Sequence, residues 1–270
     1  MRTWIILTAV TLFFGFSLFH ASWLAAAPEG IPKLVAAKGV EPTRDTQGCA
    51  SGPSASEVGS LAMAVGSEAN ALNMTTQVIG GELLVARQFE STCAADKARA
   101  NSSIGEVVYA LSKPELLWRA KGAEQAAMLL AALPAPSAVA EDKQALIGDD
   151  AAVAVFKKAR PKAWGFSIAA AQACGSDYKL SGLWGAIPDS CNQGTMLLTM
   201  DQVGYTLWGW PNRFLARTDA AGLKVVIAEN VDGDSITGLT DVNRYGDIAN
   251  SFNGYIWIQD IEALGPALKR

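Results

Sequence analysis

Short apolar runs that alternate with helix-like segments are the feature that most constrains how this chain can fold. The run Lys33–Val40 is mostly apolar and has Gly39 near its end, as expected of a buried strand that leads into a tight turn. Alternating strands and helices with short links predict a parallel sheet with helices packed outside it. Predicted strands lie at 33–40, 70–74, 83–87, 116–120, 144–148, 163–167, 195–200, 224–228 and 254–258.

The amino terminus predicts export. Arg2 precedes the apolar run Trp4–Phe19, and the small residues Ala25–Ala27 follow it. A basic start, a hydrophobic core and a small-residue end are typical of a secretory signal peptide. An uncleaved membrane anchor, which needs roughly 20 apolar residues, is the alternative. We therefore predict that residues 1–27 form a signal peptide or an N-terminal membrane anchor. Residues 28–270 then form one domain in the periplasm or cell envelope, attached to the inner membrane if the segment is not cleaved.

Charge, cysteine and histidine content narrow the class of protein. The net charge of −4 gives no sign of a nucleic-acid partner. Four cysteines suit an exported protein with two disulfides, and no Cys/His cluster suggests zinc. His20 is the only histidine and lies inside the export segment, so the predicted domain has no imidazole. This excludes a His-based catalytic triad, a His–metal site and a His general base in that domain.

Several separate stretches resemble, in order, an exported bacterial branch of the glycerophosphodiester phosphodiesterase family. The clearest match is Leu207–Arg217, Leu-Trp-Gly-Trp-Pro-Asn-Arg-Phe-Leu-Ala-Arg, and Asn253–Leu268 resembles the family's last strand and helix. Ser22–Ala25 also resembles the branch, as does the strand that ends at Gly39. The resemblance covers roughly residues 22–270. It implies a single-domain α/β fold, a TIM-type (β/α)8 barrel.

The four cysteines fall where this branch tends to place them. Cys49 follows the first predicted strand and Cys93 follows the third, so their loops are expected at the same end of a barrel. We predict disulfides Cys49–Cys93 and Cys174–Cys191.

The residues that carry catalysis in this family are missing here. The family hydrolyses glycerophosphodiesters with two histidines and a Mg²⁺ or Ca²⁺ ion held by acidic residues. Its functional positions fall on Ala37, Lys38, Ala71, Asn73, Arg87, Arg119 and Lys121. Ala37 and Arg87 stand for the two histidines and cannot act as general bases. Ala71 and Asn73 stand for the metal acids and offer no charged oxygen. We predict no catalytic residue, no metal and no cofactor at these positions.

Cationic side chains replace the acidic ones in this predicted pocket. Lys38, Arg87, Arg119 and Lys121 would converge at one mouth of the barrel, where like charges repel one another. A bound anion would relieve that repulsion, and arginine binds phosphate oxygens in bidentate geometry. The prediction is therefore a catalytically degenerate homologue that binds a small anionic or phosphate-bearing ligand directly.

Alternatives to this interpretation remain open. The four cations can instead extend into solvent or pair with acids such as Asp45, Glu90 or Glu229. One alternative function is an active phosphodiesterase, that is, a phosphoric diester hydrolase, that uses non-standard residues. Another is a regulatory partner of an active paralogue. The acidic stretch Asp232–Gly238 misses the spacing of an EF-hand and is interpreted as a loop.

Overall fold

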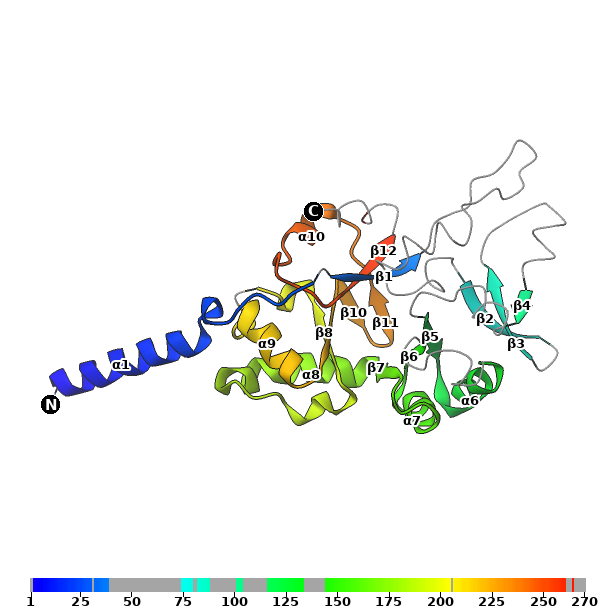
Figure 1. Cartoon of the computed structure of the whole chain (residues 1–270), viewed down its shortest axis with the longest axis horizontal. Coiled ribbons are helices and arrows are strands. Elements are labelled where there is room, and N and C mark those ends of the chain that lie inside the picture. The colour runs from blue at the N-terminus through cyan, green and yellow to red at the C-terminus, as the bar shows by residue number, and fades with distance from the viewer. Residues whose placement is uncertain are drawn as a thin grey trace.

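The computed structural model describes residues 2–30, 32–38, 74–79, 82–87, 101–103, 116–133, 144–204, 206–260 and 264, and its elements are labelled in Figure 1. Its α-helices are α1 (Arg2–His20), α6 (Gly122–Ala132), α7 (Asp150–Ala159), α8 (Ile168–Ser181), α9 (Asn212–Ala220) and α10 (Val242–Gly246). Short 3-10 helices are η1 (Ser22–Leu24), η3 (Gly182–Trp184), η4 (Asp189–Gln193) and η5 (Met200–Gln202). Its strands are β1 (Lys33–Lys38), β2 (Met74–Ile79), β3 (Glu82–Arg87), β4 (Asn101–Ser103), β5 (Leu116–Ala120), β6 (Gln144–Gly148), β7 (Trp164–Ser167), β8 (Thr195–Thr199), β9 (Lys224–Ala228), β10 (Asn230–Asp232), β11 (Ser235–Thr237) and β12 (Tyr255–Asp260).

Two parallel sheets form the centre of this structure. One has the strand order β1-β12-β9-β8 and the other has the order β5-β6-β7. Alternate residues of a strand face opposite sides of its sheet. In β9, Val226 and Ala228 face a core shared by both sheets, whereas Val225 and Ile227 pack into a second core with residues of α8 and α9. Burial on both faces explains why these strands are continuous apolar runs in the sequence.

The core between the two sheets is apolar and well filled. Leu117, Ile147 and Phe166 enter it from β5, β6 and β7, and Leu197 and Trp257 enter it from β8 and β12. A separate core packs the outer side of β5 and β6 against α6 and α7. The β/α order therefore buries apolar surface on both sides of each parallel sheet, as the sequence predicts.

The predicted TIM-type (β/α)8 barrel is nevertheless wrong. Within the described residues the strands form separate sheets and no closed barrel. β7 and β8 share no backbone ladder there, although the Trp164 Nε1–H donates to Thr195 Oγ1 at 2.9 Å. β2, β3 and β4 form a third, antiparallel sheet. Only two residues separate β2 from β3, which is enough for a hairpin and too few for the crossover between parallel neighbours.

Helix ends follow local signals in the sequence. Asp149 caps α7 by accepting from the Ala152 amide, and Ser167 caps α8 by accepting from the Ala170 amide. α9 begins after Pro211, and Gly222 follows its end with a positive φ of 67°. The chain thus turns from strand to helix at a polar residue that follows β6, Asp149, and at the polar residue that ends β7, Ser167.

The amino-terminal helix α1 extends away from the sheets, as Figure 1 shows. Its side chains are largely exposed up to Phe16, and His20 contacts the rest of the protein. Among the described residues, no helix combines the length and apolar character needed to cross a membrane.

Candidate functional site

Charged side chains gather where β5, β8 and β9 end, and we call this region the strand-end face. It comprises Arg119, Lys121, Asp201, Glu229, Asp234 and Arg244. Each of these residues lies at or just after the carboxyl end of a parallel strand, or in the segment that follows β9. Carboxyl ends of parallel strands are where α/β proteins commonly place their binding residues. This region is therefore the candidate functional site.

Two of the predicted anion-binding cations contact the same residue, Asp234. The Arg119 guanidinium donates to the main-chain carbonyl of Asp234. The Lys121 ammonium lies 3.8 Å from Asp234 Oδ2, and the two side chains are 81% and 70% exposed. An exposed pair at this distance contributes about 0.2–1 kcal/mol. Arg119 is bonded to a neutral carbonyl, so the positive charge of this pair of residues exceeds the negative charge of their partner.

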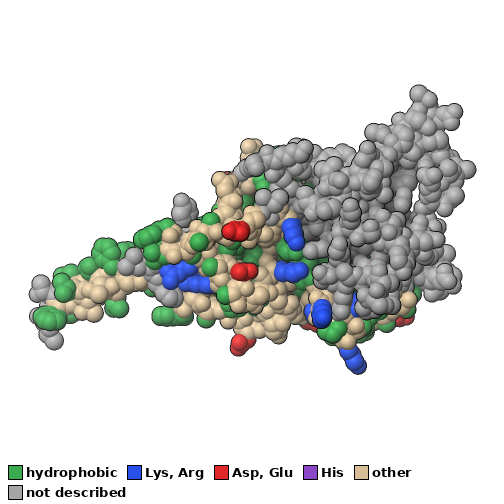
Figure 2. Space-filling model, viewed as in Figure 1, with side chains coloured by type: hydrophobic (Ala, Val, Ile, Leu, Met, Phe, Trp, Pro, Cys, Tyr) green, Lys and Arg blue, Asp and Glu red, His purple; other side chains and the backbone are tan. Residues whose placement is uncertain are grey.

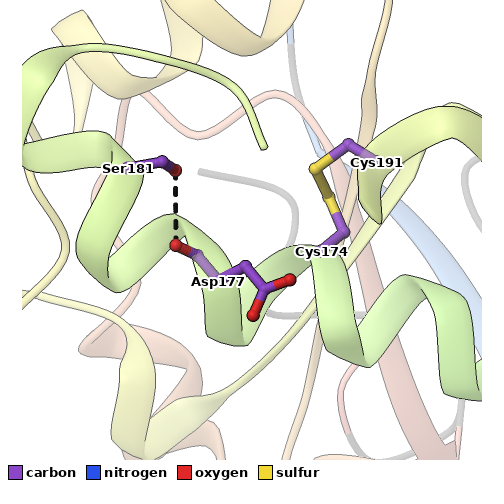
Figure 3. The surroundings of a disulfide bond; sticks show 4 residues. All are labelled: Cys174, Asp177, Ser181 and Cys191. Atoms are coloured by element: carbon purple, nitrogen blue, oxygen red, sulfur yellow. Dashed lines mark hydrogen bonds between the residues drawn. A yellow bond between two sulfur atoms is a disulfide. The ribbon is translucent and has the colours of Figure 1, made fainter. Parts of the chain in front are cut away.

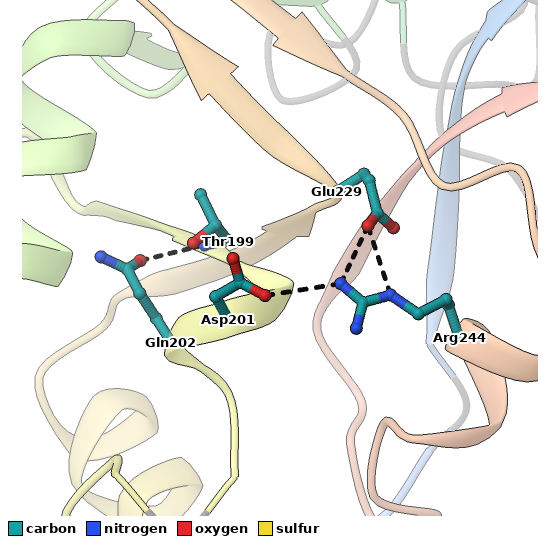
Figure 4. Close-up of polar contacts among 5 residues, drawn as sticks. All are labelled: Thr199, Asp201, Gln202, Glu229 and Arg244. Atoms are coloured by element: carbon teal, nitrogen blue, oxygen red, sulfur yellow. Dashed lines mark hydrogen bonds and ion pairs between the residues drawn. The ribbon is translucent and has the colours of Figure 1, made fainter.

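A second group on the same face contains two carboxylates and one guanidinium, so its net charge is negative. Arg244 Nη2 lies 2.9 Å from Glu229 Oε1 and 3.5 Å from Asp201 Oδ1, and Arg244 Nε also donates to Glu229. Figure 4 shows the guanidinium between the two carboxylates, with Asp201 next to the Thr199–Gln202 turn. The hydrogen bond to Glu229 raises the pKa of Arg244. Two carboxylates already occupy this guanidinium, which makes it a poorer anion site than Arg119.

The β10–β11 hairpin links these two groups. It begins directly after Glu229, and the Glu229 amide donates to Thr237 O at 3.0 Å. Val231 and Ile236 pack against the core between the two parallel sheets. The turn that carries Asp234 then reaches the end of β5, roughly 10 Å from the hairpin base for strands of this length. The stretch interpreted from sequence as a loop is therefore a hairpin that crosses the strand-end face.

A polar network around the Asp150 carboxylate lies beside the ends of β6 and β7. The Ser167 hydroxyl donates to Asp150 Oδ1 at 2.6 Å, and the Gln193 amide donates to the same oxygen at 2.9 Å. Gln193 also accepts from the Ser167 amide at 2.6 Å. Ser167 is fully buried and has no imidazole near it to activate the hydroxyl, because the only histidine lies in α1. This network fixes the start of α8 and shows no nucleophile.

The structure does not bring all the predicted site residues together. Ala37 and Lys38 lie at the end of β1, where Lys38 pairs in register with Asp260 of β12. Arg87 ends β3, in the antiparallel sheet rather than beside β5. Ala71 and Asn73, as well as the predicted pair Cys49–Cys93, lie outside the described residues. In the described part of the chain, Arg119 and Lys121 share an environment, the one formed by Asp234.

The predicted Cys174–Cys191 disulfide is confirmed. It joins α8 to η4, as Figure 3 shows, and both cysteines are buried. In the same view the Ser181 hydroxyl donates to the main-chain carbonyl of Asp177 one helical turn away. The disulfide ties the middle of α8 to η4, the segment that precedes β8, and none of the strand-end face residues takes part in it.

The chemistry of the strand-end face is that of ion pairing. No group of three or more His, Cys, Asp or Glu side chains in the described part of the chain is arranged to hold a metal ion. The sole imidazole, His20, is hydrogen-bonded to Leu183 O at 2.8 Å. Comparison with protein-family models, with curated proteins and with solved structures finds no match to this chain. The site must therefore be interpreted from its own residues.

Asp201 and Arg244 are site residues that the sequence interpretation did not single out, whereas Asp234 was considered only within a stretch interpreted as a loop. Asp234 lies in an acidic Gly-containing stretch that matches no metal motif, and Arg244 lies in a five-residue helix. The available signal was the placement of Asp201 and Glu229 immediately after two apolar runs. Polar residues directly after buried parallel strands are candidates for a binding site even when their family roles are absent.

Proposed function

We propose that this protein is an exported, non-hydrolytic binding protein that takes a small phosphate-bearing anion at the strand-end face without a metal. The proposal keeps the relationship to the glycerophosphodiester phosphodiesterase family, which rests on residue matches alone. Arg119 and Lys121 are the proposed ligand-binding residues. Lys38 and Arg87 are not among the proposed ligand-binding residues, because no described contact joins them to Arg119 or Lys121.

The observation that carries the proposal is the charge count around Asp234. Two cations, Arg119 and Lys121, face one carboxylate, and the Arg119 guanidinium is bonded to a carbonyl instead of a carboxylate. A phosphate monoester could accept from the Arg119 guanidinium in bidentate geometry and pair with the Lys121 ammonium. The exposure of both partners in the Lys121–Asp234 pair lets an anion compete for the ammonium at low cost.

The absence of imidazole from the strand-end face supports a role without hydrolysis. The family's reaction uses two histidines, and here His20 is held in α1 by Leu183 O. Two of the acidic groups on the face, Asp201 and Glu229, flank Arg244. Both carboxylates are engaged by this guanidinium, so neither stands free to take the place of a histidine.

Calorimetry on the full chain in EDTA, with glycerol 3-phosphate and inorganic phosphate as separate ligands, tests the proposal. We expect millimolar or tighter binding that weakens as salt is raised, because exposed charges are screened within about 10 Å at 0.1 M. Arg119→Ala and Lys121→Ala should each weaken binding several-fold. Lys158→Ala, which removes an exposed cation from α7, is the matched control and should leave binding unchanged.

The variant Asp234→Asn gives the sharper test because its effect has the opposite sign. Removing the carboxylate frees Lys121 and should strengthen phosphate binding by about twofold to fivefold, the equivalent of an exposed ion pair. If Asp234→Asn weakens binding or leaves it unchanged, the anion does not compete for this pair and the proposed site is wrong. Metal-dependent hydrolysis of glycerophosphocholine that disappears in Glu229→Gln would instead support the active phosphodiesterase.

A further inference from the structure

Large apolar side chains lie exposed where α1 meets the rest of the protein, and we call this surface the junction face. On the body, Leu180 at the end of α8 is 80% exposed and Trp184 in η3 is 76% exposed. On the amino-terminal side, Trp23 and Leu24 in η1 are 74% and 51% exposed. Figure 2 shows apolar side chains continuing from α1 on to the adjoining end of the body. Exposed tryptophans grouped in this way are typical of interaction surfaces.

Specific contacts hold the two sides of the junction face together. His20 Nε2 lies 2.8 Å from Leu183 O, and its ring lies 4.8 Å from that of Trp208. The Trp208 Nε1–H in turn donates to the main-chain carbonyl of Lys179 at 2.8 Å. Asn212 Nδ2 donates to Ala25 O at 3.3 Å. These bonds place the end of α1 against η3 and the end of α8, and the segment after η1 against α9.

Basic side chains accompany the apolar ones. Lys179 is exposed in the last turn of α8, between Tyr178 and Leu180. The pKa of His20 is lowered, first by burial and further by the nearby charges of Arg217 and Arg213. Figure 2 shows a group of Lys and Arg side chains where α1 joins the body. The junction face therefore combines exposed tryptophan with positive charge.

The helix that leads to this face is apolar around its whole circumference. Four consecutive residues, Trp4, Ile5, Ile6 and Leu7, are between 61% and 77% exposed. Four consecutive positions of an α-helix cover all of its sides. A helix of this kind is covered by an apolar environment and not by a single protein groove. Lipid acyl chains, which are apolar on every side, therefore suit α1 better than a protein groove does.

We propose that the junction face rests on the surface of an anionic phospholipid bilayer. Tryptophan is favoured at the boundary between headgroups and acyl chains because its ring is apolar and its N–H is polar. Lys179 and Arg213 are placed to meet the phosphate groups of anionic lipid, and basic residues near such a surface strengthen binding. Leu180 and Trp184 would enter the headgroup region. This contact belongs to the folded body as well as to α1, and it is independent of the anion site at the strand-end face.

Hydrogen exchange of the full chain, with and without vesicles of phosphatidylcholine containing about 30% phosphatidylglycerol, locates the contact. We expect vesicles to slow exchange in peptides covering residues 179–187 as well as in α1. Slower exchange in α1 alone would mean that the body does not touch the lipid, and it would overturn the proposal. Slower exchange in 179–187 that appears without vesicles and grows with protein concentration would identify a second copy of the chain as the occupant, and it would overturn the proposal too.

Variants then separate the contribution of the body from that of α1. Leu180→Ser combined with Trp184→Ser should weaken binding to these vesicles about tenfold or more, because both residues lose their apolar contact with lipid. Val242→Ser, which removes an exposed apolar residue from α10, is the matched control and should bind like wild type. Lys179→Glu should weaken binding to anionic vesicles and leave binding to pure phosphatidylcholine unchanged. Equal binding by wild type and the double variant would refute the lipid contact.

Discussion

Replacing Asp149 tests how the turn between β6 and α7 is held. The two carboxylate oxygens of Asp149 serve different donors. Oδ1 accepts from the Ala152 amide at 2.8 Å, and Oδ2 accepts from the Gly122 amide at 2.7 Å. The first bond caps α7, and the second connects it to the start of α6. We expect Asp149→Ala to destabilise the protein by losing both bonds, and Asp149→Asn to lose only one, because an amide has a single acceptor oxygen.

The expected size of the loss follows from these two bonds. Loss of a helix N-cap costs about 1 kcal/mol, and loss of a partly exposed hydrogen bond to a carboxylate costs about another 1 kcal/mol. Asp149→Ala should therefore lower the free energy of unfolding by about 2 kcal/mol, and Asp149→Asn by about 1 kcal/mol. At about 2–4 °C per kcal/mol for a protein of this size, the midpoints should fall by about 4–8 °C and 2–4 °C. Asp219→Ala, an exposed aspartate in the last turn of α9, is the control and should change the midpoint by about 1 °C or less.

The pH dependence gives an independent check. The pKa of Asp149 is lowered, mainly by the hydrogen bond from the Ala152 amide and then by the one from Gly122. A carboxyl whose folded pKa is depressed contributes stability above its unfolded pKa of about 3.9, and that contribution is lost as the pH falls through the folded pKa. The midpoint difference between wild type and Asp149→Ala should be constant from about pH 5 to 8 and shrink below about pH 4. Differential scanning fluorimetry across this range measures it. Equal midpoints for the Ala and Asn variants, or a gap that persists to low pH, would refute the two-bond account.

Three further stability predictions can be measured by urea unfolding of the full chain. The double variant Cys174→Ser/Cys191→Ser should lower the free energy of unfolding by about 3 kcal/mol, because the disulfide joins residues that are 17 positions apart in the sequence. An unchanged unfolding midpoint would contradict this. Ser167→Ala should lose about 1–2 kcal/mol, because its buried hydroxyl both caps α8 and donates to Asp150; a loss no larger than that of an exposed Ser→Ala change would contradict it. Gly238→Ala should lose about 3 kcal/mol or fail to fold, because its Cβ would clash with the β12 backbone, and wild-type stability would show that this strand moves easily.

The parallel strands were predictable because their burial is simple. The runs 116–120, 144–148 and 224–228 are strands with the predicted bounds. Each has buried apolar residues on both faces, so a nearly continuous apolar run is the expected pattern, interrupted in 116–120 by the exposed Arg119. Helix starts were predictable for a similar reason, since Asp149 and Asp150 mark the beginning of α7 in the sequence as they do in the structure.

How the sheets close was not predictable from the same signals. A run of apolar residues indicates a strand but does not say which neighbour it pairs with or in which direction. The strands predicted at 70–74 and 83–87 were interpreted as part of a parallel series. In the structure β2 and β3 are separated by only two residues, a spacing that permits only antiparallel pairing. In the described part of the chain β7 and β8 form no backbone ladder, and the composition of the two strands does not predict this.

The strand-end face shows why substitution at single positions is a weak guide to what a site does. Reading the replaced residues alone gives four cations and no acid, which predicts strong repulsion. The structure separates Arg87 from Arg119 and Lys121 by sheet, and it supplies Asp234 from the hairpin that follows β9. Neutralisation is incomplete, because one carboxylate faces two cations and one of those cations binds only a carbonyl. The charge that remains belongs to two neighbouring residues, so whatever binds there should be small, singly or doubly anionic, and in direct competition with Asp234.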